Sequence, residues 1–394
     1  MIGVAILGYT HIRKDFGEKT GILFSFLTIF MPISLLYSQE IRMYSWAMFF
    51  VTLTTIYAYR MITNNKKKDW ILFTLFSIIS AYMHYFALFT VGFLNLFILI
   101  HILRKRKELV KKYIIVAIAQ IVLYIPGLVV FLKQSLQVAM GFWIVVKYPD
   151  VLIETIRYHF QGNLTNTVSL IFALAVYAYI IFRFIKNKKE KVSILSISLF
   201  LAVVIFTLLV SRFRAVFIPR YTMPMMGLLM FFIATVMSKE TKKYITAIIC
   251  SLVVVVAIYN NYLSIKENYA SNNRDMEKFI SENLEEDDIF VYDNIGVGSL
   301  TAFDFKDNQQ YFYNGGHWGI HTAYKAFLPS MEVIDYLESL DDYKGRVWVI
   351  DGEQAGMVNV LKDRYNTVTI IEPTSIHMDY NNTTCTVSLI EIGE

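Results

Sequence analysis

Long apolar blocks recur along the first two thirds of the chain, separated by short polar segments. A helix crosses about 30 Å of hydrocarbon with roughly 20 apolar residues, so each block predicts a membrane-spanning helix. The blocks, about nine in number and some of them short, lie at residues 21–36, 45–62, 70–83, 85–103, 113–132, 167–185, 193–210, 223–237 and 244–263. The pattern therefore predicts a polytopic α-helical bundle.

The pattern changes near residue 264. Beyond it, amphipathic segments typical of helices alternate with short runs typical of strands. The predicted helices are 274–284, 330–340 and 357–365, and the predicted strands are 288–292, 346–350, 367–371 and 384–390. We therefore expect two domains, a membrane domain at 1–263 and a small α/β domain at 264–394 that is long enough to bury its own core.

Composition agrees with a membrane protein. Hydrophobic residues make up 56% of the chain and aromatic residues 15%, and the mean hydropathy is +0.47, whereas soluble domains are about 45–50% apolar. The net charge of +5 hides an asymmetry, because residues 264–394 hold 23 acidic and 9 basic residues and residues 1–263 hold 9 acidic and 28 basic ones. Cys250 and Cys385 indicate neither a disulfide framework nor a metal site.

The basic residues of the first domain gather in alternate loops between the predicted spans, which argues against a nucleic-acid partner. These loops are 11–19, 66–68, 104–112, 186–191 and 239–243. The positive-inside rule places them in the cytoplasm. By parity, the segment around Glu40, the His84 turn, the loop 133–166, the segment 212–221 and the acidic α/β domain are expected on the outer face of the plasma membrane.

The octet Tyr37-Ser38-Gln39-Glu40-Ile41-Arg42-Met43-Tyr44 lies between two apolar blocks. An unpaired Glu or Arg at the bilayer centre costs roughly 2.5–3.5 kcal/mol, so this pair indicates an interface or a watery cavity. In a helix, Tyr37, Glu40 and Tyr44 would share one face and Arg42 would point elsewhere. In an extended turn, Glu40 and Arg42 would form an ion pair. The sequence leaves both conformations open.

Carboxylates are scarce on the predicted outer face of the membrane domain, where only Glu40, Asp150 and Glu154 lie. The same face carries cationic and aromatic groups, which suit a lipid-phosphate-linked sugar because Arg binds phosphate with forked hydrogen bonds and aromatic rings cover sugar and prenyl faces. These groups are Arg42, His84, Trp143, Arg157, His159, Arg212, Arg214 and Arg220.

Three segments carry a resemblance to a known family. The run Ser38-Gln39-Glu40-Ile41-Arg42-Met43-Tyr44 resembles the Ser-Gln-Glu-x-Arg-Met-Tyr signature of bacterial membrane glycosyltransferases of the GT-C superfamily. These are family-39-type proteins related to protein O-mannosyltransferases and to the aminoarabinose transferase that modifies lipid A. The segments Met83-His84-Tyr85-Phe86 and Pro219-Arg220-Tyr221 resemble two further stretches of that family, in the same order.

The resemblance implies a GT-C-like helix bundle that transfers a sugar, with inversion, from a polyprenyl-phosphate donor to an envelope acceptor. The substrate-binding residues that it implies are Glu40, Arg42, Tyr44, His84, Tyr85, Arg220 and Tyr221. Glu40 is assigned to binding, with a general-base role as the alternative. Glu40 and His84 are also the candidate ligands of a divalent metal ion, the one cofactor that we consider.

The family places a general-base carboxylate in a first outer loop, for which there is no room before His11. Residues 1–9 are apolar but too short to span a membrane, so we expect either a missing upstream segment or a degenerate, non-catalytic relative. The alternative function is therefore a non-enzymatic binding protein or flippase for lipid-linked sugars.

Several residues also have simpler interpretations. Arg212, Arg214 and Arg220 could be interfacial side chains at span ends, and Trp143 is an expected interface anchor. The segment 150–159 is expected to form an amphipathic helix on the membrane surface. In the α/β domain, His317 and His321 flank Trp318 in a Gly-rich loop, which favours sugar binding over a metal site. Residues Asn163, Asn381 and Asn382 match glycosylation acceptors.

Overall fold

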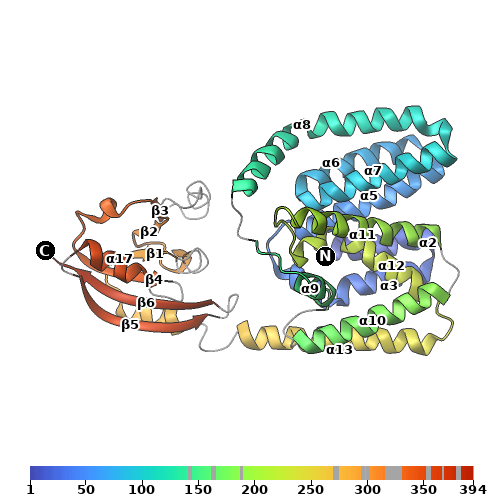
Figure 1. The fold of residues 1–394 in the computed structure, drawn as a ribbon. Helices are drawn as coiled ribbons and strands as arrows, with labels where there is room; N and C mark the ends of the chain where they lie inside the picture. The colour runs from blue at the N-terminus through green and yellow to red at the C-terminus, as the bar shows by residue number, and fades with distance from the viewer. Residues whose placement is uncertain are drawn as a thin grey trace. The chain divides into compact units, whose positions relative to one another are not determined.

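The computed structural model describes residues 1–140, 144–160, 166–186, 190–268, 275–293, 298, 302–315, 331–351, 356–365, 368–378 and 383–393. The chain divides into two compact units, Met1–Leu263 and Ser264–Glu394. The first unit consists of helices and the second contains a sheet (Figure 1). This confirms the predicted class, a polytopic helical protein with a C-terminal α/β unit.

The first unit contains sixteen described helical elements in chain order. They are α1 (Ile2–Leu7), η1 (Gly8–Ile12), α2 (Arg13–Phe16), α3 (Glu18–Phe30), α4 (Pro32–Gln39), α5 (Tyr44–Asn64), α6 (Lys67–Met83), α7 (Tyr85–Lys105), η2 (Lys107–Leu109), α8 (Val110–Met140), α9 (Asp150–Tyr158), α10 (Asn166–Lys186), α11 (Lys191–Ser211), η3 (Pro219–Met225), α12 (Met226–Ser238) and α13 (Lys243–Asn268).

All nine predicted blocks are helical. Within the described helices, six are long and apolar enough to cross a membrane, and the bent pair α3–α4 would make a seventh. α6 falls outside this set because it has 17 residues, and α5 because Thr, Tyr and Arg side chains dilute its apolar sequence. α3 and α4 meet at 58° because Met31, which precedes Pro32, is extended.

Helix α6 runs antiparallel to its neighbours α5 and α7, and the three helices define the two ends of the bundle. Tyr44 begins α5, Met83 ends α6 and Tyr85 begins α7, so these residues lie at one end. The basic segments 66–68 and 104–112 lie at the other end. The centre is occupied by α12, in which every residue from Met226 to Met237 is buried.

The second unit is a six-stranded mixed sheet with helices on both faces. Its strands are β1 (Ile289–Tyr292), β2 (Gln310–Tyr313), β3 (Met331–Ile334), β4 (Gly345–Asp351), β5 (Val368–Met378) and β6 (Thr383–Ile392). The strand order is β3-β2-β1-β4-β6-β5, with parallel pairing from β3 to β4 and antiparallel pairing of β6 with β4 and β5.

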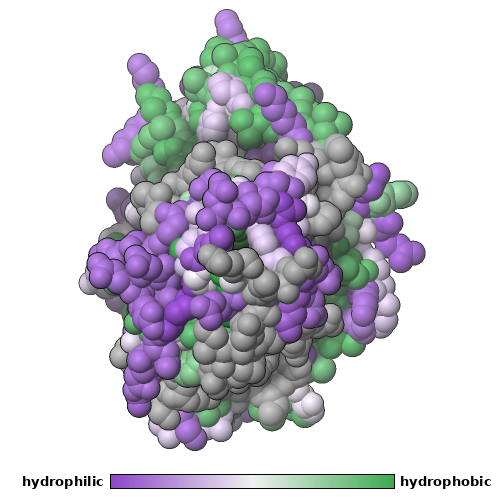
Figure 2. All heavy atoms as spheres, turned by 90° about the vertical axis from the view of Figure 1, so that its left-hand side faces the viewer, coloured by the Kyte–Doolittle hydropathy of each residue, from purple (hydrophilic) through white to green (hydrophobic). Residues whose placement is uncertain are grey.

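Alternate residues of the central strands face opposite sides of this sheet. On one face, Phe290 and Trp348 pack with α14 (Asp275–Asn283). On the other face, Val347 and Val349 pack with α17 (Gly356–Arg364). Both faces of the sheet are therefore covered. On the side of the unit that Figure 2 shows, most of the described surface residues are hydrophilic.

One predicted element of the second unit is wrong. Residues 330–340 were expected as a helix, but their described part, 331–340, contains β3 and then the 3-10 helix η5 (Leu337–Leu340). The apolar spacing fits a helix, but parallel pairing with β2 decides the conformation. Strand β2 itself was not predicted.

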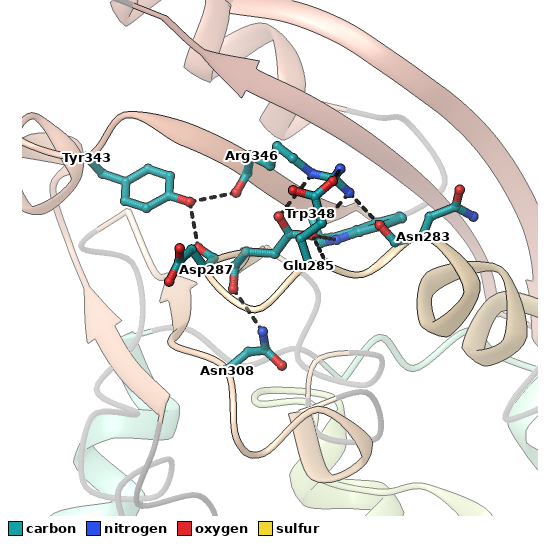
Figure 3. Close-up of polar contacts among 8 residues, drawn as sticks. Asn283, Glu285, Asp287, Asn308, Tyr343, Arg346 and Trp348 are labelled. Atoms are coloured by element: carbon teal, nitrogen blue, oxygen red, sulfur yellow. Dashed lines mark hydrogen bonds and ion pairs between the residues drawn. The ribbon is translucent and has the colours of Figure 1, made fainter.

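A polar network fastens the start of β1 to β4 (Figure 3). The buried carboxylate of Asp288 accepts a hydrogen bond from Trp348 Nε1 at 2.8 Å and forms an ion pair with Arg346 Nε at 3.0 Å. Arg346 also pairs with Glu285, and the Tyr343 hydroxyl donates to the Arg346 carbonyl at 2.8 Å. The network pairs the opposite charges at the end of the sheet where β1 and β4 begin.

Candidate functional site

The octet around Glu40 is not a continuous helix. α4 ends at Gln39, Glu40 is extended with φ −80° and ψ 128°, and α5 begins at Tyr44. Arg42 Nε lies 3.7 Å from Glu40 Oε2, so of the two conformations that the sequence allowed, the structure has the turn with an internal ion pair. Both side chains are partly exposed, Arg42 by 48% and Glu40 by 37%. A ligand can therefore reach them.

His84 lies in the break between α6 and α7. Its extended backbone, with φ −163° and ψ 143°, makes it the N-cap of α7, where Nδ1 accepts a hydrogen bond from the Phe86 amide at 3.1 Å. Burial lowers the pKa of His84 to about 4. At neutral pH the ring is therefore uncharged, and because Nδ1 is an acceptor we assign the proton to Nε2, which remains a donor.

The imidazole of His84 lies between two tyrosines from remote parts of the chain. Its ring centroid is 5.3 Å from that of Tyr44 and 5.2 Å from that of Tyr221. Tyr221 belongs to η3, which begins at Pro219. The octet, the His84 turn and η3 therefore meet at one end of the bundle.

Arg220 brings a positive charge to this meeting point. Its guanidinium carbon is 5.9 Å from the centroid of the Tyr221 ring. Its charge also acts on the hydroxyls of Tyr37 and Tyr44, and Tyr37 is in turn close enough to interact with the Glu40 carboxylate. We call the group of Glu40, Arg42, Tyr44, His84, Arg220 and Tyr221 the polar cluster.

The end of helix α9 brings in His159, one of the predicted outer-face groups, and Tyr158, which no sequence pattern indicated. The Tyr158 hydroxyl donates to the Tyr37 hydroxyl at 2.5 Å. His159 is buried, with Nδ1 2.5 Å from the Tyr177 hydroxyl and Nε2 3.4 Å from Thr222 Oγ1 of η3. The amphipathic pattern predicted helix α9 correctly. The pattern did not indicate that the end of this helix contacts Tyr37 and Thr222, next to the polar cluster.

Other predicted residues lie apart from this cluster. The Tyr85 ring packs on Phe131 of α8 with centroids 5.2 Å apart, and its hydroxyl donates to Gln134. The Arg212 guanidinium stacks on the Tyr148 ring at 5.1 Å, and Arg214 is exposed. The predictions for Trp143, Asn163, His317, His321, Asn381 and Asn382 fall outside the described residues.

The part of the chain that the structure describes has no group of three or more His, Cys, Asp and Glu side chains that could enclose a metal ion. Mg²⁺ is commonly held by one or two carboxylates together with substrate phosphates. Glu40 fits that mode, with a bound phosphate supplying further oxygens. A metal at Glu40 or His84 remains a prediction.

The helix bundle and the α/β unit belong to a GT-C-like fold class. Among solved structures, the chain is similar to the crystal structure of ArnT from Cupriavidus metallidurans in the apo state, with a TM-score of 0.54 and 9% identity over 98% of this chain and 83% of that one. At this identity the likeness shows the fold alone. No family model matches the sequence, and no curated protein matches it. The narrower family-39 assignment remains a prediction.

Proposed function

We propose that this chain is a membrane glycosyltransferase of the hexosyltransferase type. It moves a sugar from a polyprenyl-phosphate donor to an envelope lipid, glycan or protein, with inversion at the anomeric carbon. The observation that carries this proposal is the convergence of Glu40, His84 and Arg220, from three segments far apart in the sequence, at one end of the bundle. The GT-C fold supports it.

The donor phosphate is assigned to the cationic side of the polar cluster. Arg220 binds it with the forked geometry of a guanidinium. Arg42, whose contact with Glu40 is long and partly exposed, can exchange that weak pairing for the phosphate. The uncharged His84 donates from Nε2 to a phosphate or sugar oxygen. The partly exposed ring of Tyr221 covers the apolar face of the sugar or the first prenyl unit, and the buried ring of Tyr44 packs against His84.

The reaction needs positioning and charge stabilisation at this site. The acceptor hydroxyl attacks the anomeric carbon on the face opposite the phosphate, loses its proton to a base, and the polyprenyl phosphate leaves with the bonding electrons. Arg220 stabilises the charge that develops on the leaving phosphate. Glu40 orients the acceptor hydroxyl, and the general-base role is its alternative assignment.

We place the polar cluster and the α/β unit on the extracytoplasmic face of the plasma membrane, because the basic loops lie at the opposite end of the bundle. On this side, polyprenyl-linked sugars and envelope acceptors share one compartment with the cluster.

The test is donor binding and transfer by the full chain in detergent, with labelled polyprenyl-phosphate hexoses. Hydrogen bonds to charged groups contribute about 1.5–3 kcal/mol, so Arg220→Gln is expected to weaken donor binding by roughly 10- to 150-fold. Arg214→Gln, at an exposed Arg outside the cluster, should change it by no more than about twofold. Equal effects of the two substitutions, or no binding of any such donor, would contradict the proposal. Binding without transfer would support the non-enzymatic alternative.

A further inference from the structure

A cavity of about 390 Å³ lies inside the helix bundle, away from the polar cluster. Helices α5, α7, α11 and α12 line it. On α5 the lining begins at Thr52, about 12 Å along the helix from Tyr44 at 1.5 Å per residue, and continues to Thr63 beside the basic loops. The cavity is therefore a separate space that opens toward the basic end of the bundle.

The cavity wall is mostly apolar. Thr52 Oγ1 donates to the Met48 carbonyl at 2.7 Å, Thr55 Oγ1 donates to the Thr52 carbonyl at 2.8 Å, and Ser196 Oγ donates to the Leu228 carbonyl at 2.8 Å. A buried water needs two to four polar partners, and the wall presents few polar groups. The interior therefore suits a hydrocarbon chain better than water.

The mouth of the cavity is cationic. His101, Arg106 and Lys191 line it, and His101 and Lys191 are exposed. Arg106 donates to the Ile62 carbonyl at 2.7 Å and pairs with Glu108. Glu190, which precedes Lys191, pairs with Lys239. Glu108 and Glu190 thus offset the charges of Arg106 and Lys239, and Lys191 leaves the mouth with a net positive charge.

The cavity also reaches the apolar surface that faces lipid. Leu195 of α11 lines it and is 49% exposed. Both α7 and α11 are long and apolar enough to span a membrane. A chain from a neighbouring lipid can therefore enter between spans while its headgroup stays at the basic end, where basic pockets between helices bind anionic headgroups.

We propose that this cavity binds one anionic glycerophospholipid of the inner leaflet. One acyl chain fills the space between α5, α7, α11 and α12, and the headgroup phosphate contacts Arg106 and Lys191, with His101 beside it. Charge complementarity at the mouth and the dry wall select this ligand over a zwitterionic lipid or a soluble anion. The proposal is independent of the proposed transferase function, because the cavity shares no residue with the polar cluster.

Native mass spectrometry of the full chain in a neutral detergent, with added dioleoyl phosphatidylglycerol or dioleoyl phosphatidylcholine, tests this proposal. We expect one phosphatidylglycerol to bind at least tenfold more tightly than phosphatidylcholine. The double variant Arg106→Gln/Lys191→Gln should lose at least tenfold of that affinity. The matched variant Lys111→Gln/Lys243→Gln, which removes two exposed charges outside the cavity lining, should change it less than threefold. Unchanged melting temperatures exclude unfolding as the cause.

Other results would overturn the proposal. Equal affinity for the two lipids, or equal losses in the two double variants, would mean that the mouth does not select an anion. Competition by glycerol phosphate without acyl chains would indicate a soluble anion site. Displacement of phosphatidylglycerol by undecaprenyl phosphate, lost in Arg106→Gln/Lys191→Gln, would assign the cavity to the donor tail instead.

Discussion

Replacing Gly227 by alanine should strain the contact between helices α5 and α12. Gly227 is the second residue of α12, directly after η3. A Cβ added there would lie 2.2 Å from Thr52 Oγ1 of α5, far inside normal contact. The Thr52 hydroxyl donates to the Met48 carbonyl at 2.7 Å, and a β-branched side chain in a helix has few rotamers. Either this hydrogen bond breaks or α12 moves away from α5.

The size of the effect follows from two opposing terms. Overpacking a tight contact costs about 1–3 kcal/mol, whereas Gly to Ala in a helix interior stabilises by up to about 1 kcal/mol. Gly92 of α7 supplies the matched control, because an added Cβ there meets nothing within 4 Å. The propensity gain cancels between the two variants, so Gly227→Ala should be less stable than Gly92→Ala by about 1–3 kcal/mol.

Thermal unfolding of the full chain in detergent, followed by helical circular dichroism, measures this difference. Thr52→Ala provides a rescue, because it removes Oγ1 and leaves the Thr52 Cβ at 3.4 Å from the added methyl group, an ordinary contact. The double variant should therefore recover most of the loss, as expected for residues in direct contact. Equal stability of Gly227→Ala and Gly92→Ala would refute the reasoning, and so would the absence of rescue.

Three further predictions concern charge. The lowered pKa of His84 means that the unfolded state binds more protons than the folded state between pH 6.5 and about 4. The free energy of unfolding should therefore fall as the pH falls through this window, and it should fall less in His84→Gln. Urea titrations at each pH measure this difference. Asp288→Ala leaves the Arg346 guanidinium without its buried partner and should destabilise the second unit by about 3–5 kcal/mol in denaturant titrations, while the exposed Asp342→Ala should have little effect. If Glu40 holds a divalent ion, EDTA should weaken donor binding in the wild type and leave Glu40→Gln unchanged; an equal loss in both would count against the ion.

Apolar periodicity predicts the helices of the first unit well, because membrane spans need long apolar sequences. Two of the predicted blocks lie in helices that are shorter or less apolar than a typical span, α6 and α5. Residues 330–340 show where the pattern fails, because a helical spacing of apolar positions cannot report that β2 lies alongside. Tertiary pairing decides such segments.

The candidate site was partly predictable from the charges of the loops and the order of the spans. Sidedness brings Glu40, His84 and Arg220 to one end of the bundle, and it follows from charge and parity. The docking of Tyr158 onto Tyr37 depends on how α9 packs, which no local pattern encodes. Tyr85 was predicted as a substrate-binding residue but packs against α8. The sequence cannot show that Tyr85 points away from the cluster while its neighbour His84 faces it.

The most direct test of the central claim is a cryo-EM structure of the full chain with a polyprenyl-phosphate sugar bound. The account predicts phosphate density within hydrogen-bond distance, about 3 Å, of the Arg220 guanidinium, with the sugar beside His84 and Glu40. Phosphate density elsewhere in the bundle, with Glu40 and Arg220 far apart, would contradict it.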